Sequence, residues 1–305
     1  MYERFWDVII VGGGPAGLSA ALTLGRCRRS VLICDAGRYR NRAAHHMHGF
    51  LTRDGIGPGD FLELARADVL RYPTVELCSS EVCNAICREN SFDVTLEDGS
   101  VLRARKLLLA TGVVDELPSV EGFERFYGKS AHHCPYCDGW EWRDQPIAAY
   151  GRGEKGAGLA LMLKQWSADL ALFTDGPAQL SAQYCERLAA HEIPVYEERI
   201  ARMEGTGDGL LQQIVLASGT CVGRRAFFFN TGQHQRSALA IALGCELTSK
   251  GGVEANDYDV ATNIPGVYVA GDASRDVQLV VVAVAEGTKA AFAINKALLG
   301  EAGLT

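Results

Sequence analysis

The sequence lacks any apolar run long enough to cross a membrane. A transmembrane helix needs about 20 apolar residues, and the longest apolar run here is Leu279–Ala285. A basic block is also missing, because 30 Lys and Arg stand against 37 Asp and Glu and the net charge is −7. Such a chain has no electrostatic footprint for nucleic acid or for an anionic lipid surface. We therefore expect neither of these partners.

Cysteine is too sparse for a disulfide framework. Ten cysteines are spread over 305 residues, and eight of them stand singly, which is typical of reduced cytosolic thiols. The opening MYERFWD carries acidic residues and leads directly into a strand pattern, so we expect no signal peptide and a cytoplasmic protein. One cysteine pair, Cys134 and Cys137, needs a separate explanation.

Glycine is abundant, with 34 residues, and several glycines separate a strand pattern from a helix pattern. Residues 5–11 (FWDVIIV) form a short β-branched apolar run that predicts a buried strand. GGGPAG follows, then good helix formers at 18–27, and then a second apolar run at 30–35. This order is typical of a βαβ unit.

The glycine loop has the spacing G-x-G-x-x-G at Gly12, Gly14 and Gly17. These glycines allow a tight turn, close approach of a pyrophosphate to the backbone, and close packing of helix on strand. Asp35 ends the next strand, where a carboxylate can accept hydrogen bonds from a ribose. The context predicts a dinucleotide site; the alternative is a glycine-rich turn without a ligand.

A second unit of the same order begins at residue 146. A strand pattern at 146–150 leads into Gly151, Gly153 and Gly156, and a helix pattern follows before the next strand at 169–175. Two such units in one chain indicate two nucleotide-binding folds.

Both halves continue alike, with a hairpin pattern running into a buried strand at 92–112 and again at 212–232. A final unit at 267–299 has a strand, Gly271-Asp272 and a long apolar helix. We expect this helix to pack in the core, with its N-terminus directed at the bound cofactor. The predicted class is α/β, with two Rossmann-like, three-layer nucleotide-binding domains, the second inserted in the first. The expected domains are 1–117 with 246–305, and 118–245.

Cys134 and Cys137 stand in the motif CPYCDG. At this spacing one thiolate can attack and the other can resolve, and Asp138 can handle the thiol proton. The alternatives are inert thiols or half of a zinc site, although a second C-x-x-C is missing. We expect redox chemistry and no metal. Two groups of histidines are the ligands that a metal could otherwise use: His132 and His133, and His45, His46 and His48.

Five motifs, in order, resemble the low-molecular-weight thioredoxin reductase family of flavoprotein disulfide oxidoreductases. They are GGGPAG, ATG at 110–112, CPYCDG, the second glycine loop, and GVYVAGD at 266–272. The resemblance implies FAD in the first domain, NADPH in the second and a homodimer. It also implies that Cys137 faces the flavin, that Cys134 exchanges with substrate, and that Asp138 is the acid/base.

The resemblance and the loops together define a set of expected cofactor-binding residues. For FAD the residues are Gly12, Gly14, Pro15, Ala16, Gly17, Asp35, Val82, Ala110, Thr111, Gly112, Gly271, Asp272, Gln278 and Leu279; for a nicotinamide nucleotide they are Gly151, Gly153, Gly156 and Asp175.

Three departures indicate a divergent branch of that family. Asp175 ends the strand where the family has arginines, and no arginine follows before Arg187, so a 2′-phosphate would be repelled and NADH is favoured over NADPH. Gln278-Leu279 replaces an Arg-Gln pair, and 41–60 lacks Asn-x-Pro-Gly-Phe and carries the three histidines. One histidine of that cluster could act as a base near the dithiol, or all three could face solvent.

Two enzymatic hypotheses follow. In the first, electrons from NAD(P)H pass through FAD and the Cys134–Cys137 disulfide to a thioredoxin-like protein or a small-molecule disulfide. In the second, which the missing arginines motivate, an FAD-only oxidase closes substrate disulfides and passes electrons to oxygen. The non-enzymatic alternative is a redox sensor or a zinc-holding module. Trp140 and Trp142 are expected to pack, with the shaping of an apolar substrate groove as the alternative.

Overall fold

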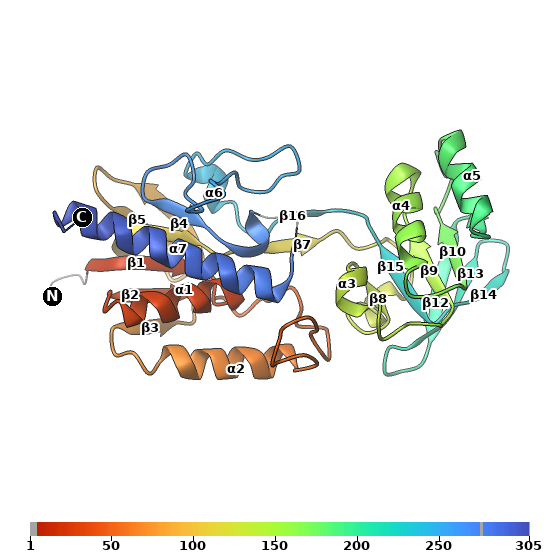
Figure 1. Cartoon of the computed structure of the whole chain (residues 1–305), viewed down its shortest axis with the longest axis horizontal. Coiled ribbons are helices and arrows are strands. Elements are labelled where there is room, and N and C mark those ends of the chain that lie inside the picture. The colour runs from red at the N-terminus through yellow and green to blue at the C-terminus, as the bar shows by residue number, and fades with distance from the viewer. Residues whose placement is uncertain (1–4, 275–276, 305) are drawn as a thin grey trace.

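The computed structural model describes residues 5–274 and 277–304, so residues 1–4, 275–276 and 305 of the expected first domain lie outside it. Figure 1 shows two α/β lobes joined by a narrow crossing. The crossing is the antiparallel pair of β7 (Val113–Asp115) and β16 (Gln233–Gln235). Within the described residues, no helix is both long and apolar enough to cross a bilayer.

The first lobe is built on a seven-stranded sheet in the order β3-β2-β1-β6-β5-β4, with β17 also paired to β6. Its strands are β1 (Phe5–Val11), β2 (Val31–Cys34), β3 (Val75–Cys78), β4 (Val82–Cys87), β5 (Phe92–Leu96), β6 (Val101–Leu109) and β17 (Val267–Val269). Strands β3, β2, β1, β6 and β17 are parallel, whereas β4 and β5 form an antiparallel extension. Its helices are α1 (Pro15–Arg26), α2 (Pro58–Val69), α6 (Leu239–Ala242) and α7 (Val280–Glu301).

Helices α1 and α7 lie side by side on one face of this sheet (Figure 1). Their contact depends on Gly287, because a Cβ there would overlap the backbone carbonyl of Ala16. Helix α1 begins with Pro15, whose fixed φ and missing N–H suit a first helical position. The close pairing therefore holds the first glycine loop beside the segment that contains Asp272.

The second lobe contains a fully parallel sheet in the order β11-β10-β9-β15-β8 and a separate antiparallel sheet β12-β13-β14. Its strands are β8 (Ala131–His132), β9 (Ile147–Tyr150), β10 (Leu170–Phe173), β11 (Val195–Tyr196), β12 (Ile200–Gly205), β13 (Leu211–Leu216), β14 (Cys221–Gly223) and β15 (Ala226–Phe229). Helices α3 (Pro135–Asp138), α4 (Gly153–Leu163) and α5 (Ala182–Ala190) complete this lobe, together with a short 3-10 turn at Phe123–Arg125. In the first lobe, a second 3-10 turn at Gly271–Ala273 follows β17.

The predicted fold class is confirmed, and both βαβ units form where the sequence places them. The two halves differ in one respect. In the first half the hairpin and the buried strand share the single strand β6, whereas in the second half they are separate, with β14 and β15 in different sheets.

Core contacts place the C-terminal boundary of the inserted domain earlier in the chain than residue 245, where we expected it. Leu239, Ala240 and Cys245 pack in one buried cluster with Trp6 and other residues of the first sheet. These residues therefore belong with the first lobe, and we propose that the chain crosses back at β16.

We predict opposite effects for two glycine substitutions within helices. Gly287→Ala should lower the free energy of unfolding by about 1–3 kcal/mol, because the new methyl forces α7 away from α1. Gly158→Ala in α4 is the control: a Cβ there has no atom within 4 Å, so it should raise the free energy by about 0.5–1 kcal/mol. Urea unfolding followed by circular dichroism measures both. Equal effects would show that the helices are not in close contact at Gly287.

Candidate active site

A single cavity runs from the first glycine loop to the disulfide and is lined by residues of both lobes. Fifteen of the expected site residues line it: Gly12, Gly14, Pro15, Ala16, Asp35, Val82, Ala110, Thr111, Gly112, Cys137, Asp138, Gly271, Asp272, Gln278 and Leu279. Gly17 lies under the glycine loop rather than in the cavity wall, because its Cα packs against the Gly12 carbonyl.

The glycine loop fits a dinucleotide. Gly12 has φ +108°, and a side chain there would overlap the Ala110 carbonyl. At Gly14, by contrast, a Cβ would meet no atom within 4 Å, so the backbone at the start of α1 is open to a ligand. The N-terminus of α1 has no side-chain cap, which leaves its positive end available for phosphate. These features fit the pyrophosphate of a dinucleotide.

Asp35 lies at the ribose end of this cavity, directly after β2. Its carboxylate accepts hydrogen bonds from the Gly37 N–H at 3.1 Å, from the Tyr39 hydroxyl and from the Arg66 guanidinium at 3.4 Å. Burial, and after it the hydrogen bond to the Asp35 carboxylate, raises the pKa of Tyr39 to about 12. Tyr39 is therefore a neutral hydroxyl donor, and a ribose hydroxyl would join a site already rich in polar groups.

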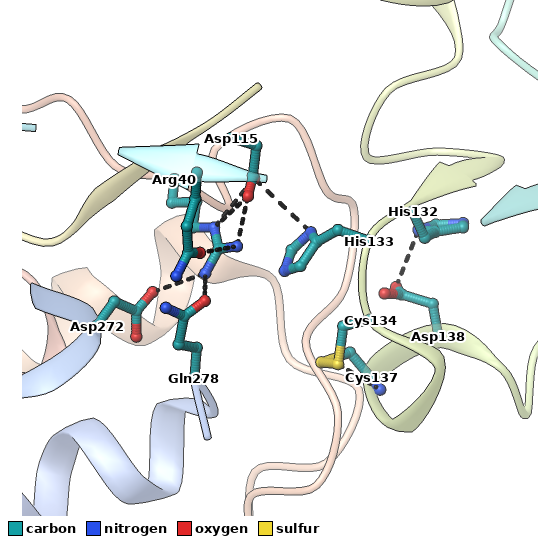
Figure 2. Close-up of a disulfide and its surroundings, with 10 residues drawn as sticks. Arg40, Asp115, His132, His133, Cys134, Cys137, Asp138, Asp272 and Gln278 are labelled. Atoms are coloured by element: carbon teal, nitrogen blue, oxygen red, sulfur yellow. Dashed lines mark hydrogen bonds and ion pairs between the residues drawn. A yellow bond between two sulfur atoms is a disulfide. The ribbon is translucent and has the colours of Figure 1, made fainter. Parts of the chain in front are cut away.

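Arg40 also lines the cavity, and no motif in the sequence pointed to it. Its guanidinium donates to Asp115 through Nε (3.0 and 3.1 Å), and to Asp272 (3.1 Å) and Gln278 through Nη1 (Figure 2). The resemblance leads us to expect an arginine where Gln278 stands, and Arg40 places its guanidinium against Gln278 from a distant segment. Its partners lie 75 to 238 residues away in sequence.

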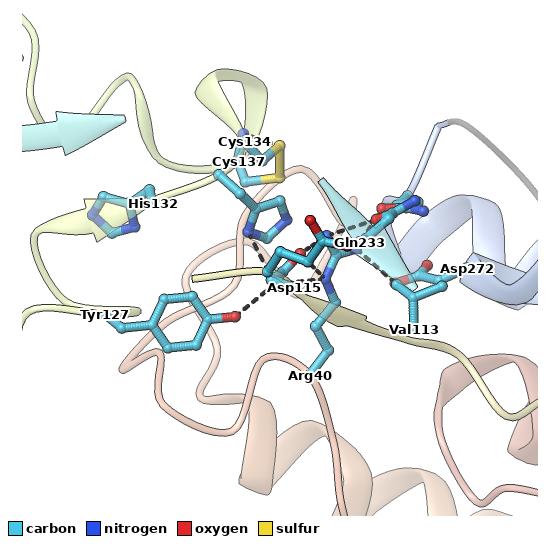
Figure 3. Close-up of polar contacts among 12 residues, drawn as sticks. Arg40, Val113, Asp115, Tyr127, His132, Cys134, Cys137, Gln233 and Asp272 are labelled. Atoms are coloured by element: carbon cyan, nitrogen blue, oxygen red, sulfur yellow. Dashed lines mark hydrogen bonds and ion pairs between the residues drawn. A yellow bond between two sulfur atoms is a disulfide. The ribbon is translucent and has the colours of Figure 1, made fainter. Parts of the chain in front are cut away.

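Asp115, on the crossing strand β7, is contacted from both lobes (Figure 3). Besides Arg40, it accepts a hydrogen bond from the Tyr127 hydroxyl at 2.6 Å, and His133 Nδ1 lies 3.7 Å away. Burial opposes ionisation of this carboxyl, but the Arg40 hydrogen bonds, the charges of His133 and Arg40, and the Tyr127 hydrogen bond together keep the pKa of Asp115 below its usual value. Burial, followed by the Arg40 charge, lowers the pKa of His133, so its imidazole is neutral near pH 7.

The Cys134–Cys137 disulfide lies at the cavity wall formed by the second lobe. Cys134 caps the short helix α3, because its sulfur accepts the Cys137 backbone N–H at 3.1 Å. Cys137 lines the cavity, whereas Cys134 is not among the lining residues. The geometry thus distinguishes the two sulfurs, and it puts Asp138 in the same wall as Cys137.

The three histidines of segment 41–60 are divided by the fold. His46 and His48 line the cavity, while His45 is exposed. His48 lies 3.5 Å from Glu141 of the second lobe, so this segment also bridges the lobes. Among the residues that the structure describes, no group of three or more His, Cys, Asp or Glu side chains is arranged to hold a metal ion.

The second glycine loop has different surroundings from the first. The N–H of Gly153 donates to the Ala178 carbonyl at 2.8 Å. Arg152 donates to the carbonyls of Thr174, at 2.7 Å, and Asp175. The Asp175 carboxylate accepts the Ile200 N–H at 2.8 Å. The Gly153 N–H and one Asp175 oxygen are therefore bonded within the protein, whereas the N-terminus of α4 has no side-chain cap.

The two tryptophans after the dithiol have different environments. Trp142 is partly buried against the core of the second lobe, as predicted. The packing prediction is wrong for Trp140, which is 65% exposed, with the Arg143 guanidinium 4.3 Å from its ring centre. Tyr136, inside the C-x-x-C motif, is 73% exposed. The short helix α3 turns these aromatic rings to the outside.

Two nucleotide-binding-type domains with a dithiol between them define a dinucleotide-dependent disulfide oxidoreductase. Comparison with known proteins agrees: the family model "Pyridine nucleotide-disulphide oxidoreductase" matches residues 6–287. The chain belongs to this family and is thioredoxin reductase-like, as predicted.

Individual relatives support the same classification. A protein of Arthroderma benhamiae named "Probable thioredoxin reductase" is 32% identical, over 90% of this chain and 75% of its own length. Thioredoxin reductase aclD of Aspergillus oryzae is 29% identical over 96% of both chains. The crystal structure of TrxB from Bacillus anthracis superposes with a TM-score of 0.92 at 35% identity, covering 97% of this chain and 99% of that chain.

We predict that Arg40→Met lowers the free energy of unfolding at pH 7 by about 3 kcal/mol, because Asp115 is left buried without its main partner. Wild-type Asp115 has a depressed pKa, so its stabilisation is complete above about pH 4 and is lost as the pH falls through the folded-state value. In the variant the unpaired carboxyl protonates at higher pH. The difference between the two proteins should therefore shrink as the pH is lowered from 7 to 4.

The control is Arg71→Met, which removes an exposed pair with Asp68 and should cost less than about 0.5 kcal/mol at either pH. Urea unfolding at the two pH values measures all three proteins. An Arg40→Met penalty that stays constant with pH would contradict the role of Asp115.

Proposed function

We propose that this protein is an FAD-dependent thiol–disulfide oxidoreductase in which the Cys134–Cys137 pair carries two electrons between a bound flavin and a substrate. The observation that supports this most is the shared cavity: Cys137, the first glycine loop and Asp272 all line it. A dithiol beside a dinucleotide cleft is the arrangement such chemistry needs.

The chain's residues have distinct proposed tasks. The first glycine loop and Asp35 would hold the ADP half of FAD, and Asp272 with its neighbours would hold the ribityl half; when bound, FAD supplies a two-electron carrier. Cys137 faces that group. Cys134, as a thiolate, attacks a substrate disulfide and releases one substrate thiolate, which Asp138 protonates. Cys137 then attacks Cys134, re-forms their disulfide and releases the second substrate thiol.

For the electron source, the first candidate is NAD(P)H, which would pass electrons through FAD to a thioredoxin-like protein or a small-molecule disulfide. The retained glycines at 151, 153 and 156 support this route. Asp175 favours NADH over NADPH, because a carboxylate repels a 2′-phosphate. We also propose that the enzyme acts as a homodimer, on the basis of the family resemblance.

A specific observation favours a second candidate, an FAD-only dithiol oxidase. The Ala178 carbonyl accepts the Gly153 N–H of the second glycine loop, and Arg152 and the Ile200 N–H bond the segment that holds Asp175. Gly151 and Gly156 are required by packing alone, because a Cβ on Gly156 would overlap the Gly151 carbonyl. In this route a substrate dithiol reduces the Cys134–Cys137 disulfide and oxygen is the final acceptor. Exposed Tyr136 and Trp140 beside the dithiol suit a small apolar substrate.

The assignment of the two sulfurs predicts different spectra for two variants. Cys134→Ser leaves a Cys137 thiolate facing the oxidised flavin, so a long-wavelength charge-transfer band should appear in its absorbance spectrum. Cys137→Ser, the matched control, should show no such band, because Cys134 does not line the cavity. A band in Cys137→Ser alone would reverse the assignment, and a protein that neither contains nor takes up FAD would disprove the proposal.

An anaerobic titration separates the two electron sources. If NAD(P)H is the donor, NADH should bleach the flavin absorbance at lower concentration than NADPH. If the oxidase route holds, neither nucleotide bleaches it, whereas dithiothreitol does, and admitting air restores the colour with one hydrogen peroxide formed per dithiol oxidised. The absence of both reactions would rule out both routes.

A further inference from the structure

His132 lies beside the dithiol but has no part in the function proposed above. It ends strand β8 and is only 6% exposed. Its Nδ1 is 3.3 Å from Asp138 Oδ1 (Figure 2), and its Nε2 accepts a hydrogen bond from Trp142 Nε1 at 3.0 Å. One imidazole therefore lies between the partly buried indole of Trp142 and the carboxylate next to Cys137.

The indole fixes the tautomer of this imidazole. An indole N–H can only donate a hydrogen bond, so His132 Nε2 must be the acceptor and carries no hydrogen. The ring hydrogen is then on Nδ1, which faces Asp138. A doubly protonated ring would bring two N–H groups together at Trp142. The ring hydrogen therefore lies on the side of the Asp138 carboxylate, whose Oδ1 is 3.3 Å from Nδ1.

Packing holds the ring in this orientation. The Phe228 ring centre lies 5.4 Å and the Trp142 ring centre 6.1 Å from that of His132. Asp138, by contrast, ends a helix of only four residues, which by itself gives a side chain little support. Of the two groups in this contact, the imidazole is therefore the one that packing holds in place.

We propose that His132 is a positioning residue: it donates from Nδ1 to one Asp138 oxygen, leaving the other to exchange a proton with the thiols of the Cys134–Cys137 pair. In this step a thiol proton passes to the Asp138 carboxylate as the Cys134 sulfur bonds to a substrate sulfur. The same proton then passes to the departing substrate thiolate. Trp142 sets the direction of the imidazole. The inference rests on the proposed function, and it adds a fixed donor behind the acid/base.

Two amide variants separate positioning from packing. In His132→Asn the amide N–H₂ takes the place of Nδ1 and can still donate to Asp138, whereas it does not reach Trp142. In His132→Gln the amide oxygen takes the place of Nε2 and still accepts from Trp142, but the donor to Asp138 is lost. If His132 only satisfied the indole, Gln would be the better replacement.

The measurement uses FAD-loaded protein under anaerobic conditions, with dithiothreitol as the probe dithiol and stopped-flow absorbance of the flavin. We expect His132→Gln to slow flavin bleaching about 10- to 100-fold and His132→Asn to stay within about threefold of wild type. Asp138→Asn should be at least as slow as His132→Gln, and adding His132→Gln to it should have little further effect. Urea unfolding of each variant shows that it is folded.

The outcomes distinguish this inference from the proposed function. If wild-type flavin is not bleached by dithiothreitol, the proposed function fails and this inference with it. If wild type reacts and His132→Gln reacts equally fast, or faster than His132→Asn, only the positioning role is disproved. A second measurement is independent of turnover: ¹⁵N-resolved NMR of the imidazole should show hydrogen on Nδ1, and hydrogen on Nε2 would overturn the proposal.

Discussion

The buried carboxylate of Asp115 is the interaction on which the arrangement of the active site depends. It lies on the two-stranded crossing between the lobes and is bonded by Arg40 from one side and by Tyr127 from the other. A buried carboxylate is costly unless it is fully paired, so both lobes are drawn to the same point. His133, in contact with this carboxylate, directly precedes Cys134. The dithiol is therefore held over the cavity by the electrostatic requirement of one residue on the crossing.

The two glycine loops have the same motif and form the same kind of turn, but their surroundings differ. In both loops, glycines allow a helix to begin close against a strand, where a Cβ would overlap a backbone carbonyl. At the first loop the space beyond Gly14 is open and continuous with the cavity. At the second, the Ala178 carbonyl accepts the Gly153 N–H, and the Arg152 side chain donates to the Thr174 carbonyl. The motif thus guarantees the turn, whereas nucleotide binding depends on what the neighbouring segments leave free.

Around the disulfide, each polar group has its direction set by a group further from the chemistry. Trp142 orients His132, which faces Asp138, and Arg40 orients Asp115, which faces His133. Both histidines border the dithiol, yet they are held by different lobes and have different partners. Such outer contacts govern how precisely acid/base groups meet reacting atoms.

The sequence by itself determined the two βαβ units, the inserted arrangement and the dithiol, because apolar periodicity and glycine spacing are local properties of the chain. Gly12 and Asp35 were predicted in this way, whereas the roles of Cys137 and Asp272 were implied by the family resemblance. Only the tertiary structure revealed Arg40, which meets Asp115 and Gln278 across 75 and 238 residues, since no local pattern encodes a contact over such a separation. The same holds for the hydrogen bond that Trp142 donates to His132 and for those that Arg152 donates to the Thr174 and Asp175 carbonyls. Each depends on which atoms the packed lobes bring within hydrogen-bond distance, and that is decided when the whole chain folds.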